Sequence, residues 1–152
     1  MTPSPSFVEA GRVGRIALSG PNERDEPMTG FRLRVPSDLR IVSAHGPDGW
    51  RAFVRETEAT WSGRSLPPAA EATFHVELEA PSEPGPAVLE TEQLYSGGEI
   101  VRWSVPLTVV PAEDARGQHL GRALAVALVG VLVAVAVAVL AWHRRTRSLQ
   151  ER

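Results

Sequence analysis

The chain has 152 residues, enough for one domain of about a hundred residues with its own hydrophobic core and one further segment. It carries 16 basic and 18 acidic side chains and no cysteine, which excludes disulfides, thiolate metal sites and cysteine nucleophiles. Residues 1–121 hold 11 Arg and 17 Asp or Glu, so this part lacks the cationic surface that binds nucleic acid phosphates. DNA and RNA are therefore not expected partners.

The first hundred residues predict short strands, because apolar and polar residues alternate with a period of two between Pro and Gly residues. The clearest alternations are Phe31, Leu33 and Val35, and then Phe74, Val76 and Leu78. Further strands are expected at residues 15–19, 40–43, 50–56, 59–61, 88–94 and 100–109. About seven or eight strands at this spacing predict an all-β fold, an antiparallel β-sandwich of the cupredoxin or immunoglobulin-like kind over residues 1–110.

A tight turn and three tryptophans complete this prediction. Ser96-Gly97-Gly98-Glu99 indicates a hairpin turn, since both central glycines can adopt a positive φ. Trp50, Trp61 and Trp103 are expected in the core, because a large aromatic side chain buries much apolar area. For Trp103 two roles remain open, packing inward or capping a site.

The C-terminal part of the chain predicts a membrane anchor. Residues 123–142 consist of seven Ala, seven Val, four Leu, one Gly and one Trp. At about 1.5 Å per residue, a helix of this length spans roughly 30 Å, the thickness of the bilayer's hydrocarbon core. We therefore predict one transmembrane helix over residues 122–142, preceded by a polar stalk at 111–121 and followed by a basic tail at 143–152.

The tail also predicts an orientation. It contains four Arg and one Glu, so the positive-inside rule places the C-terminus in the cytoplasm and the domain outside the cell membrane. The first thirty residues contain no apolar run of signal-peptide length, so this topology requires a leader encoded before Met1. A tail-anchored protein with a cytoplasmic domain is the alternative.

Sequence motifs of common enzymes are missing. The chain has no Gly-rich phosphate loop, no nucleophile elbow and no His-Glu-x-x-His pair, so we do not expect an enzyme. Its four histidines are scattered, and no two have the spacing of metal ligands, so each is expected to be solvated or interfacial; they are His45, His75, His119 and His143. By composition, the acidic loop at residues 21–27 is a solvated turn.

Several stretches nevertheless carry a resemblance. In chain order they are Ser4-Pro5-Ser6, Val8-Glu9-Ala10-Gly11, Pro21-Asn22-Glu23-Arg24-Asp25, Gly49-Trp50, Thr60-Trp61 with Gly63, and Tyr95-Ser96-Gly97-Gly98-Glu99-Ile100-Val101-Arg102-Trp103. Together they resemble the YcnI-like copper-binding domain of bacteria, in the family's order and spacing from about residue 2 to residue 106. Members of that family are extracytoplasmic, and many carry a C-terminal membrane anchor.

The resemblance implies a β-sandwich that binds Cu(II) through a single N-terminal histidine. In that site the α-amine and a ring nitrogen of the histidine chelate the metal, a Glu carboxylate adds an oxygen, and a Trp packs beside the ion. Mixed nitrogen and oxygen ligands suit Cu(II). By this resemblance, Glu23 is the carboxylate ligand and Trp103 is the tryptophan beside the metal.

The histidine itself is missing from this sequence. Aligning Ser4-Pro5-Ser6 with the family places it just before Met1. A GTG valine codon read as a start would produce this beginning, and we hypothesise that the true reading frame extends further upstream. The form that starts at Met1 is expected to bind copper weakly or not at all.

The resemblance thus implies a membrane-anchored Cu(II)-binding protein outside the cytoplasm, acting as a chaperone or buffer for copper uptake. The implied partners are the copper ion, the membrane and a membrane copper transporter. The alternative is a metal-free interaction or adhesion module, since β-sandwiches on stalks are general binding scaffolds.

Overall fold

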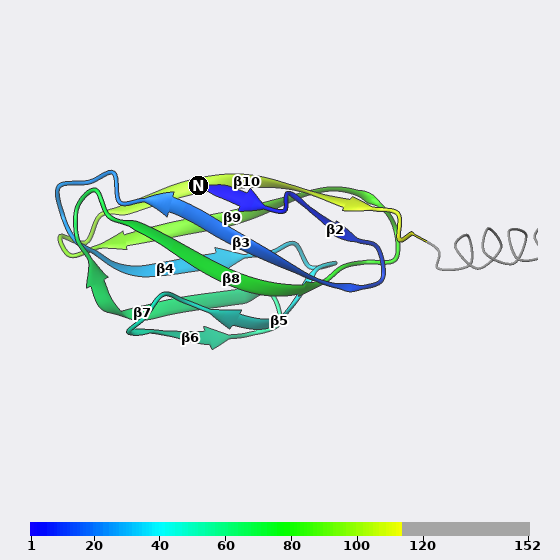
Figure 1. Ribbon diagram of the computed structural model, residues 1–152, viewed down its shortest axis with the longest axis horizontal. Coiled ribbons are helices and arrows are strands. Elements are labelled where there is room, and N and C mark those ends of the chain that lie inside the picture. The colour runs from blue at the N-terminus through cyan, green and yellow to red at the C-terminus, as the bar shows by residue number, and fades with distance from the viewer. Residues whose placement is uncertain (114–152) are drawn as a thin grey trace, which may run out of the picture. The chain divides into compact units, whose positions relative to one another are not determined.

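The computed structural model describes residues 1–113, and residues 1–112 form one compact unit whose regular structure is entirely β-strand (Figure 1). This unit contains ten strands: β1 (Thr2–Ser4), β2 (Phe7–Glu9), β3 (Val13–Pro21), β4 (Met28–Arg34), β5 (Arg40–His45), β6 (Trp50–Val54), β7 (Glu58–Leu66), β8 (Glu71–Glu79), β9 (Gly85–Tyr95) and β10 (Ile100–Val110).

The strands form two sheets that pack face to face. One sheet has four strands in the order β1-β3-β8-β5, and the other has six in the order β2-β10-β9-β4-β7-β6. Their pairings are antiparallel, except that β2 runs parallel to β10. The chain changes sheets between β1 and β2, within its first nine residues. The β-sandwich predicted from the alternation pattern is therefore confirmed.

An aromatic cluster lies at the centre of the core between the sheets. Phe74 of β8 stacks on Phe31 of β4 with ring centroids 4.2 Å apart. Trp61 of β7, which is 1% exposed, lies 5.3 Å from Phe74, and Trp50 meets Phe74 edge-on at 5.6 Å. Both sheets contribute rings to this cluster, so it joins them as well as filling the space between them.

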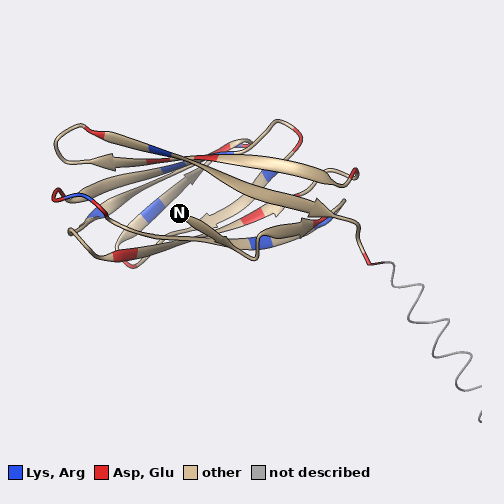
Figure 2. Ribbon diagram, turned by 90° about the horizontal axis from the view of Figure 1, so that it is seen from above, with Lys and Arg blue, Asp and Glu red and all other residues tan. Residues whose placement is uncertain are grey.

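Positions of Arg and of Asp or Glu are interspersed along the strands and loops of the sandwich (Figure 2). On the outer face of the six-stranded sheet, Glu92 of β9 lies opposite Arg32 of β4 on one side and Arg102 of β10 on the other. Glu92 is only 7% exposed because these guanidinium groups cover it. The outer face is therefore an ion-pair network rather than an apolar surface.

Two parts of the chain differ from the sequence-based expectation. The short strands β1 and β2 were not predicted, because prolines interrupt the alternation there. In the hairpin turn after β9, where either glycine could adopt a positive φ, only Gly98 does, with a φ of 87°. The turn forms as predicted, with the Gly98 N–H donating to the Tyr95 carbonyl at 3.0 Å.

The predicted anchor falls outside the described residues. Most of the stalk at 111–121, the transmembrane helix at 122–142 and the tail at 143–152 lie beyond residue 113. Within residues 1–113, no helix is long and apolar enough to cross a bilayer.

Candidate metal centre

At one end of the sandwich, the loop between β3 and β4 meets the turn between β9 and β10; β10 ends at the opposite end of the domain (Figure 1). The Glu26 carboxylate accepts the Gly97 N–H at 2.7 Å, and Arg24 forms an ion pair with Glu99 at 2.7 Å. A Cβ atom on Gly97 would collide with the Glu26 carboxylate, so the glycine permits this close approach. The two loops are thereby held together as one unit.

The β3–β4 loop is fixed at its base by Asn22, whose side chain is 1% exposed. Its Nδ2 donates to the carbonyl of Glu26 at 2.8 Å and to that of Leu66 at 3.1 Å, and its Oδ1 accepts the Arg24 N–H at 3.0 Å. The expectation of a solvated turn is therefore wrong for the base of the loop. Glu23 follows directly after this anchored residue.

A pocket of about 210 Å³ opens between this loop and strands β9 and β10 of the six-stranded sheet. It is lined by Glu23, Arg24, Gln93, Tyr95, Val101 and Trp103. The two residues predicted for a metal site, Glu23 and Trp103, thus line the same pocket, although they come from distant parts of the sequence. Trp103 packs inward from β10, against the edge of the core.

The inner wall of the pocket contains a buried polar pair that the sequence analysis missed. The Tyr95 hydroxyl donates to Gln93 Oε1 at 2.9 Å, and Gln93 Nε2 donates to the Pro21 carbonyl at 3.5 Å. Burial raises the pKa of Tyr95; Arg24 lowers it, and Glu23 and Glu99 raise it further. The phenol is therefore protonated at neutral pH and acts as a donor.

Two polar groups at this pocket are unpaired. Within residues 1–113, no hydrogen bond or ion pair joins the exposed Glu23 carboxylate to another group. Trp103 Nε1 is buried and has no hydrogen-bond partner. A free carboxylate can bind a cation, whereas an indole N–H can only donate, to an oxygen of water or of a ligand. The pocket thus offers one cation ligand and one donor.

These groups alone do not make a metal centre. In the part of the chain that the structure describes, no three His, Cys, Asp or Glu side chains are grouped so that they could hold one ion. Glu23 would need further ligands to hold an ion. The N-terminal strand β1 lies near enough to the β3–β4 loop to bring them. Thr2 of β1 lies opposite Ser19, and a Cβ on Gly20 would lie 3.4 Å from the Met1 Cα.

The register of β1 on β3 therefore directs the chain before Met1 toward Glu23. One further step in this antiparallel register would put a residue that precedes Met1 opposite Pro21, beside the loop that carries Glu23. An amine and an imidazole at that place would give Glu23 the nitrogen partners that Cu(II) prefers. Among the residues that line the pocket, Glu23 is the carboxylate that such a residue could join.

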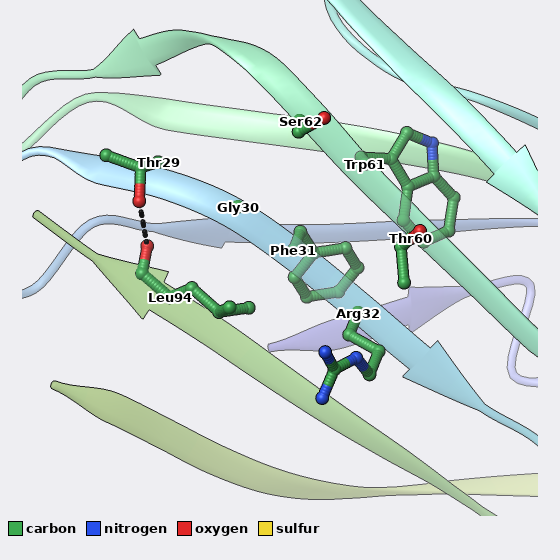
Figure 3. A pocket seen from close by; sticks show the side chains of 8 residues that line it. All are labelled: Thr29, Gly30, Phe31, Arg32, Thr60, Trp61, Ser62 and Leu94. Atoms are coloured by element: carbon green, nitrogen blue, oxygen red, sulfur yellow. Dashed lines mark hydrogen bonds between the residues drawn. The ribbon is translucent and has the colours of Figure 1, made fainter. Parts of the chain in front are cut away.

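A second hollow, of about 270 Å³, lies on the outer face of the six-stranded sheet above Gly30, where no side chain fills the surface (Figure 3). Thr60, Ser62 and Leu94 surround it, together with Arg32, whose guanidinium is paired with Glu92 at 2.7 Å. Thr29 caps one side by donating to the Leu94 carbonyl at 3.3 Å. The one charged side chain that lines this hollow is already paired, so the hollow offers no free carboxylate as the Glu23 pocket does.

No protein-family model and no curated protein matches this sequence. Several solved structures share the fold. An uncharacterized protein from Nocardia farcinica with an immunoglobulin-like fold is 21% identical, with a TM-score of 0.57 over 67% of this chain and 91% of that chain. A non-cellulosomal cohesin from the archaeon Archaeoglobus fulgidus is 14% identical, with a TM-score of 0.50 over 74% of this chain and 91% of that one.

BcpA, the major pilin subunit of Bacillus cereus, is 7% identical, with a TM-score of 0.51 over 73% of this chain. This chain spans only 39% of the pilin subunit's length, so it corresponds to one part of that protein. At these identities the likeness concerns the fold alone. Residues 1–112 of this chain therefore form an immunoglobulin-like β-sandwich.

Proposed function

We propose that this chain is a membrane-anchored, extracytoplasmic protein of the YcnI-like kind that binds Cu(II) at the pocket between Glu23 and Trp103. The observation that carries the proposal is the meeting of these two residues at one pocket, beside the place where a residue preceding Met1 would lie. Copper is the cargo, which the protein buffers or delivers to a membrane copper transporter.

The chemistry of the pocket supports this assignment. A histidine at the N-terminus would supply an amine and an imidazole nitrogen, and Glu23 would supply a carboxylate oxygen. Such a mixed set suits the tetragonal geometry of Cu(II), which ranks highest among the first-row divalent ions. Arg24 does not compete for the Glu23 carboxylate because it is paired with Glu99 at 2.7 Å. Trp103 would pack beside the ion and limit its contact with water.

The decisive experiment compares the full chain starting at Met1 with the same chain carrying one histidine before Met1 as its true N-terminus. Calorimetric titration with Cu(II) should show that the added histidine raises the affinity by at least about tenfold, or about 1.4 kcal/mol. Glu23→Ala in the histidine-bearing chain should remove most of that gain. Asp25→Ala is the matched control, since Asp25 is an exposed carboxylate on the same loop that does not line the pocket.

Two results would contradict the proposal. One is an affinity that does not rise with the added histidine, and the other is an equal loss from Glu23→Ala and Asp25→Ala. Either would favour the second candidate, a metal-free interaction module on a stalk.

The topology is tested separately. A phosphatase that is active only after export should be inactive when fused to the C-terminus, because the arginines of the tail favour the cytoplasm. An active fusion would reverse the proposed orientation.

A further inference from the structure

The register of β5 on β8 brings two histidines together on the outer face of the four-stranded sheet. His45, the last residue of β5, lies directly opposite His75 of β8. Both side chains are exposed, whereas their neighbours Ala44 and Phe74 are buried in the core. Spacing along the sequence had suggested that no two histidines could share a metal, and the pairing of the strands changes that conclusion for these two.

The pair depends on an irregularity in β5. Ile41 lies opposite Leu78 and Ser43 lies opposite Glu77, so Val42 is an extra residue without a partner. Without this bulge, the regular register would set Ala44 opposite His75 and turn His45 toward Phe74. Bulges of this kind often re-aim a side chain next to a functional site. Here the bulge sets His45 opposite His75, with both side chains on the exposed face of the sheet.

The spacing of paired residues suits a shared ion. Directly opposite residues in antiparallel strands have Cβ atoms about 4.5–5.5 Å apart. Imidazole nitrogens bind divalent metals at about 2.0–2.1 Å, so two rings that extend from such a pair can close on one ion. Among the described residues 1–113, β5 is the edge strand of its sheet, so no strand of that sheet pairs with His45 on its outer side. Water can therefore complete the coordination.

The neighbouring groups offer little competition for the imidazoles. On the other side of β8, the residue opposite His75 is Ala17, which is too small to fill the space. Two residues further along β8, on the same face as His75, Glu77 accepts hydrogen bonds from Arg15 and Ser43, both at 2.7 Å. These bonds, followed by the charges of Arg15 and His45, lower the pKa of Glu77 although burial opposes the shift, so its carboxylate is ionised and already engaged by Arg15 and Ser43.

We propose that His45 and His75 form a second cation site, separate from the Glu23 pocket, that binds a divalent first-row metal ion preferring imidazole nitrogen. The order of affinity for such ligands predicts that Cu(II) binds this site more tightly than Ni(II) or Zn(II). The pair lies on the outer face of the four-stranded sheet, whereas the Glu23 pocket is lined by β9, β10 and the β3–β4 loop. Each site can therefore be removed without the other.

The test uses the full chain starting at Met1, in detergent, with Glu23→Ala, His119→Gln and His143→Gln, so that His45 and His75 are the only remaining histidines. This parent is titrated with Cu(II), and in parallel with Zn(II), and compared with its His45→Gln and His75→Gln derivatives and with the double variant that carries both substitutions. Each single substitution should lower the Cu(II) affinity by at least about tenfold, because losing one ring removes the chelate and leaves only a single imidazole ligand. Binding through the chain's amine is common to all variants and cancels in the comparison.

The alternative is two independent exposed histidines. In that case each single variant would keep the affinity of the parent within about twofold and lose only half of the bound metal. That result would overturn the proposal, and so would a parent that binds no Cu(II) beyond the level of the double variant.

Folding is checked in the same samples. Because both side chains are exposed, the substitutions should leave the Tm without metal nearly unchanged. Saturating Cu(II) should raise the Tm of the parent, since a ligand that binds the folded state stabilises it, and should not raise the Tm of either single variant by the same amount. An equal rise in parent and variants would place the metal elsewhere and contradict the site.

Discussion

The side-chain amide of Asn22 donates to the carbonyl of Leu66 at 3.1 Å and so ties the start of the β3–β4 loop to the end of β7. The backbone of Asn22 adds two bonds, from its own N–H to the Ala70 carbonyl at 2.8 Å and from the Ala69 N–H to its carbonyl at 3.0 Å. The residue before Glu23 is thus fixed by the loop between β7 and β8 as well as by its own loop.

Asn22→Ala should therefore destabilise the domain. The substitution removes every side-chain hydrogen bond of Asn22 and leaves the carbonyls of Glu26 and Leu66 without this donor. A buried polar group left unpaired costs about 1–3 kcal/mol, and we expect a loss of this size in urea unfolding. Asp25→Ala, on the exposed part of the same loop, should change stability by less than about 0.5 kcal/mol. Equal effects of the two substitutions would contradict the anchoring role of Asn22.

Local alternation was sufficient to predict most of the strands. In β8 the buried residues Phe74, Val76 and Leu78 alternate with polar ones, and this pattern depends only on neighbouring residues. The short strands β1 and β2 were missed because their pairing with β3 and β10 comes from tertiary contacts. Local patterns do not carry this information.

The two candidate sites also depend on tertiary contacts that local sequence patterns do not carry. Glu23 and Trp103 were singled out through the family resemblance, and only the folded chain brings both of them to one pocket. Gln93 could have been found, because it is a polar residue at an inward position of β9. The pair of His45 and His75 could not, since it depends on a one-residue bulge in β5 that no local pattern signals.

A second prediction concerns the aromatic cluster. Phe74 contacts the rings of Phe31, Trp61 and Trp50 and is fully buried, so Phe74→Ala should leave a cavity between the sheets. The expected loss is about 3–5 kcal/mol in the free energy of unfolding. Phe53→Ala is the matched control, because Phe53 is 60% exposed and should cost about 1 kcal/mol or less. Similar losses for both phenylalanines would mean that Phe74 is not central to the core.

A third prediction concerns Gly63, whose φ is +152° and whose backbone faces the loop before β6. A Cβ at this position would collide with the Gly49 carbonyl oxygen and lie 2.9 Å from the Trp50 Cα. Both contacts are with backbone, so Gly63→Ala should force β6 away from β7 and cost about 1–3 kcal/mol. Gly85→Ala, where a Cβ would meet nothing within 4 Å, should be nearly neutral. A neutral Gly63→Ala would show that β6 can shift freely.

The fourth prediction concerns the acid stability that Glu92 provides. Its Oε2 lies 2.7 Å from Arg32, and its Oε1 lies 3.1 Å from Arg102 and 3.4 Å from Arg34. Burial acts to raise the pKa of Glu92, but the hydrogen bond from Arg102 and the charges of Arg34 and Arg32 outweigh it, so the pKa is lowered. In the unfolded chain the same carboxyl titrates near its usual value of about 4.3.

The unfolded state therefore binds this proton first as the pH falls. The stability that Glu92 contributes is fully present above about pH 4.3 and is lost as the pH drops through the lowered pKa of the folded state. Glu92→Gln should lower the urea midpoint at pH 7, and its difference from the parent should shrink steadily below about pH 4, because protonated Glu92 resembles the amide. Glu90→Gln, an exposed neighbour on the same strand that accepts from Ser104, should show little difference at either pH. A difference between Glu92→Gln and the parent that stays constant from pH 7 to pH 3 would mean that the effect is one of packing, and that the three guanidinium groups do not act through the charge of the carboxylate.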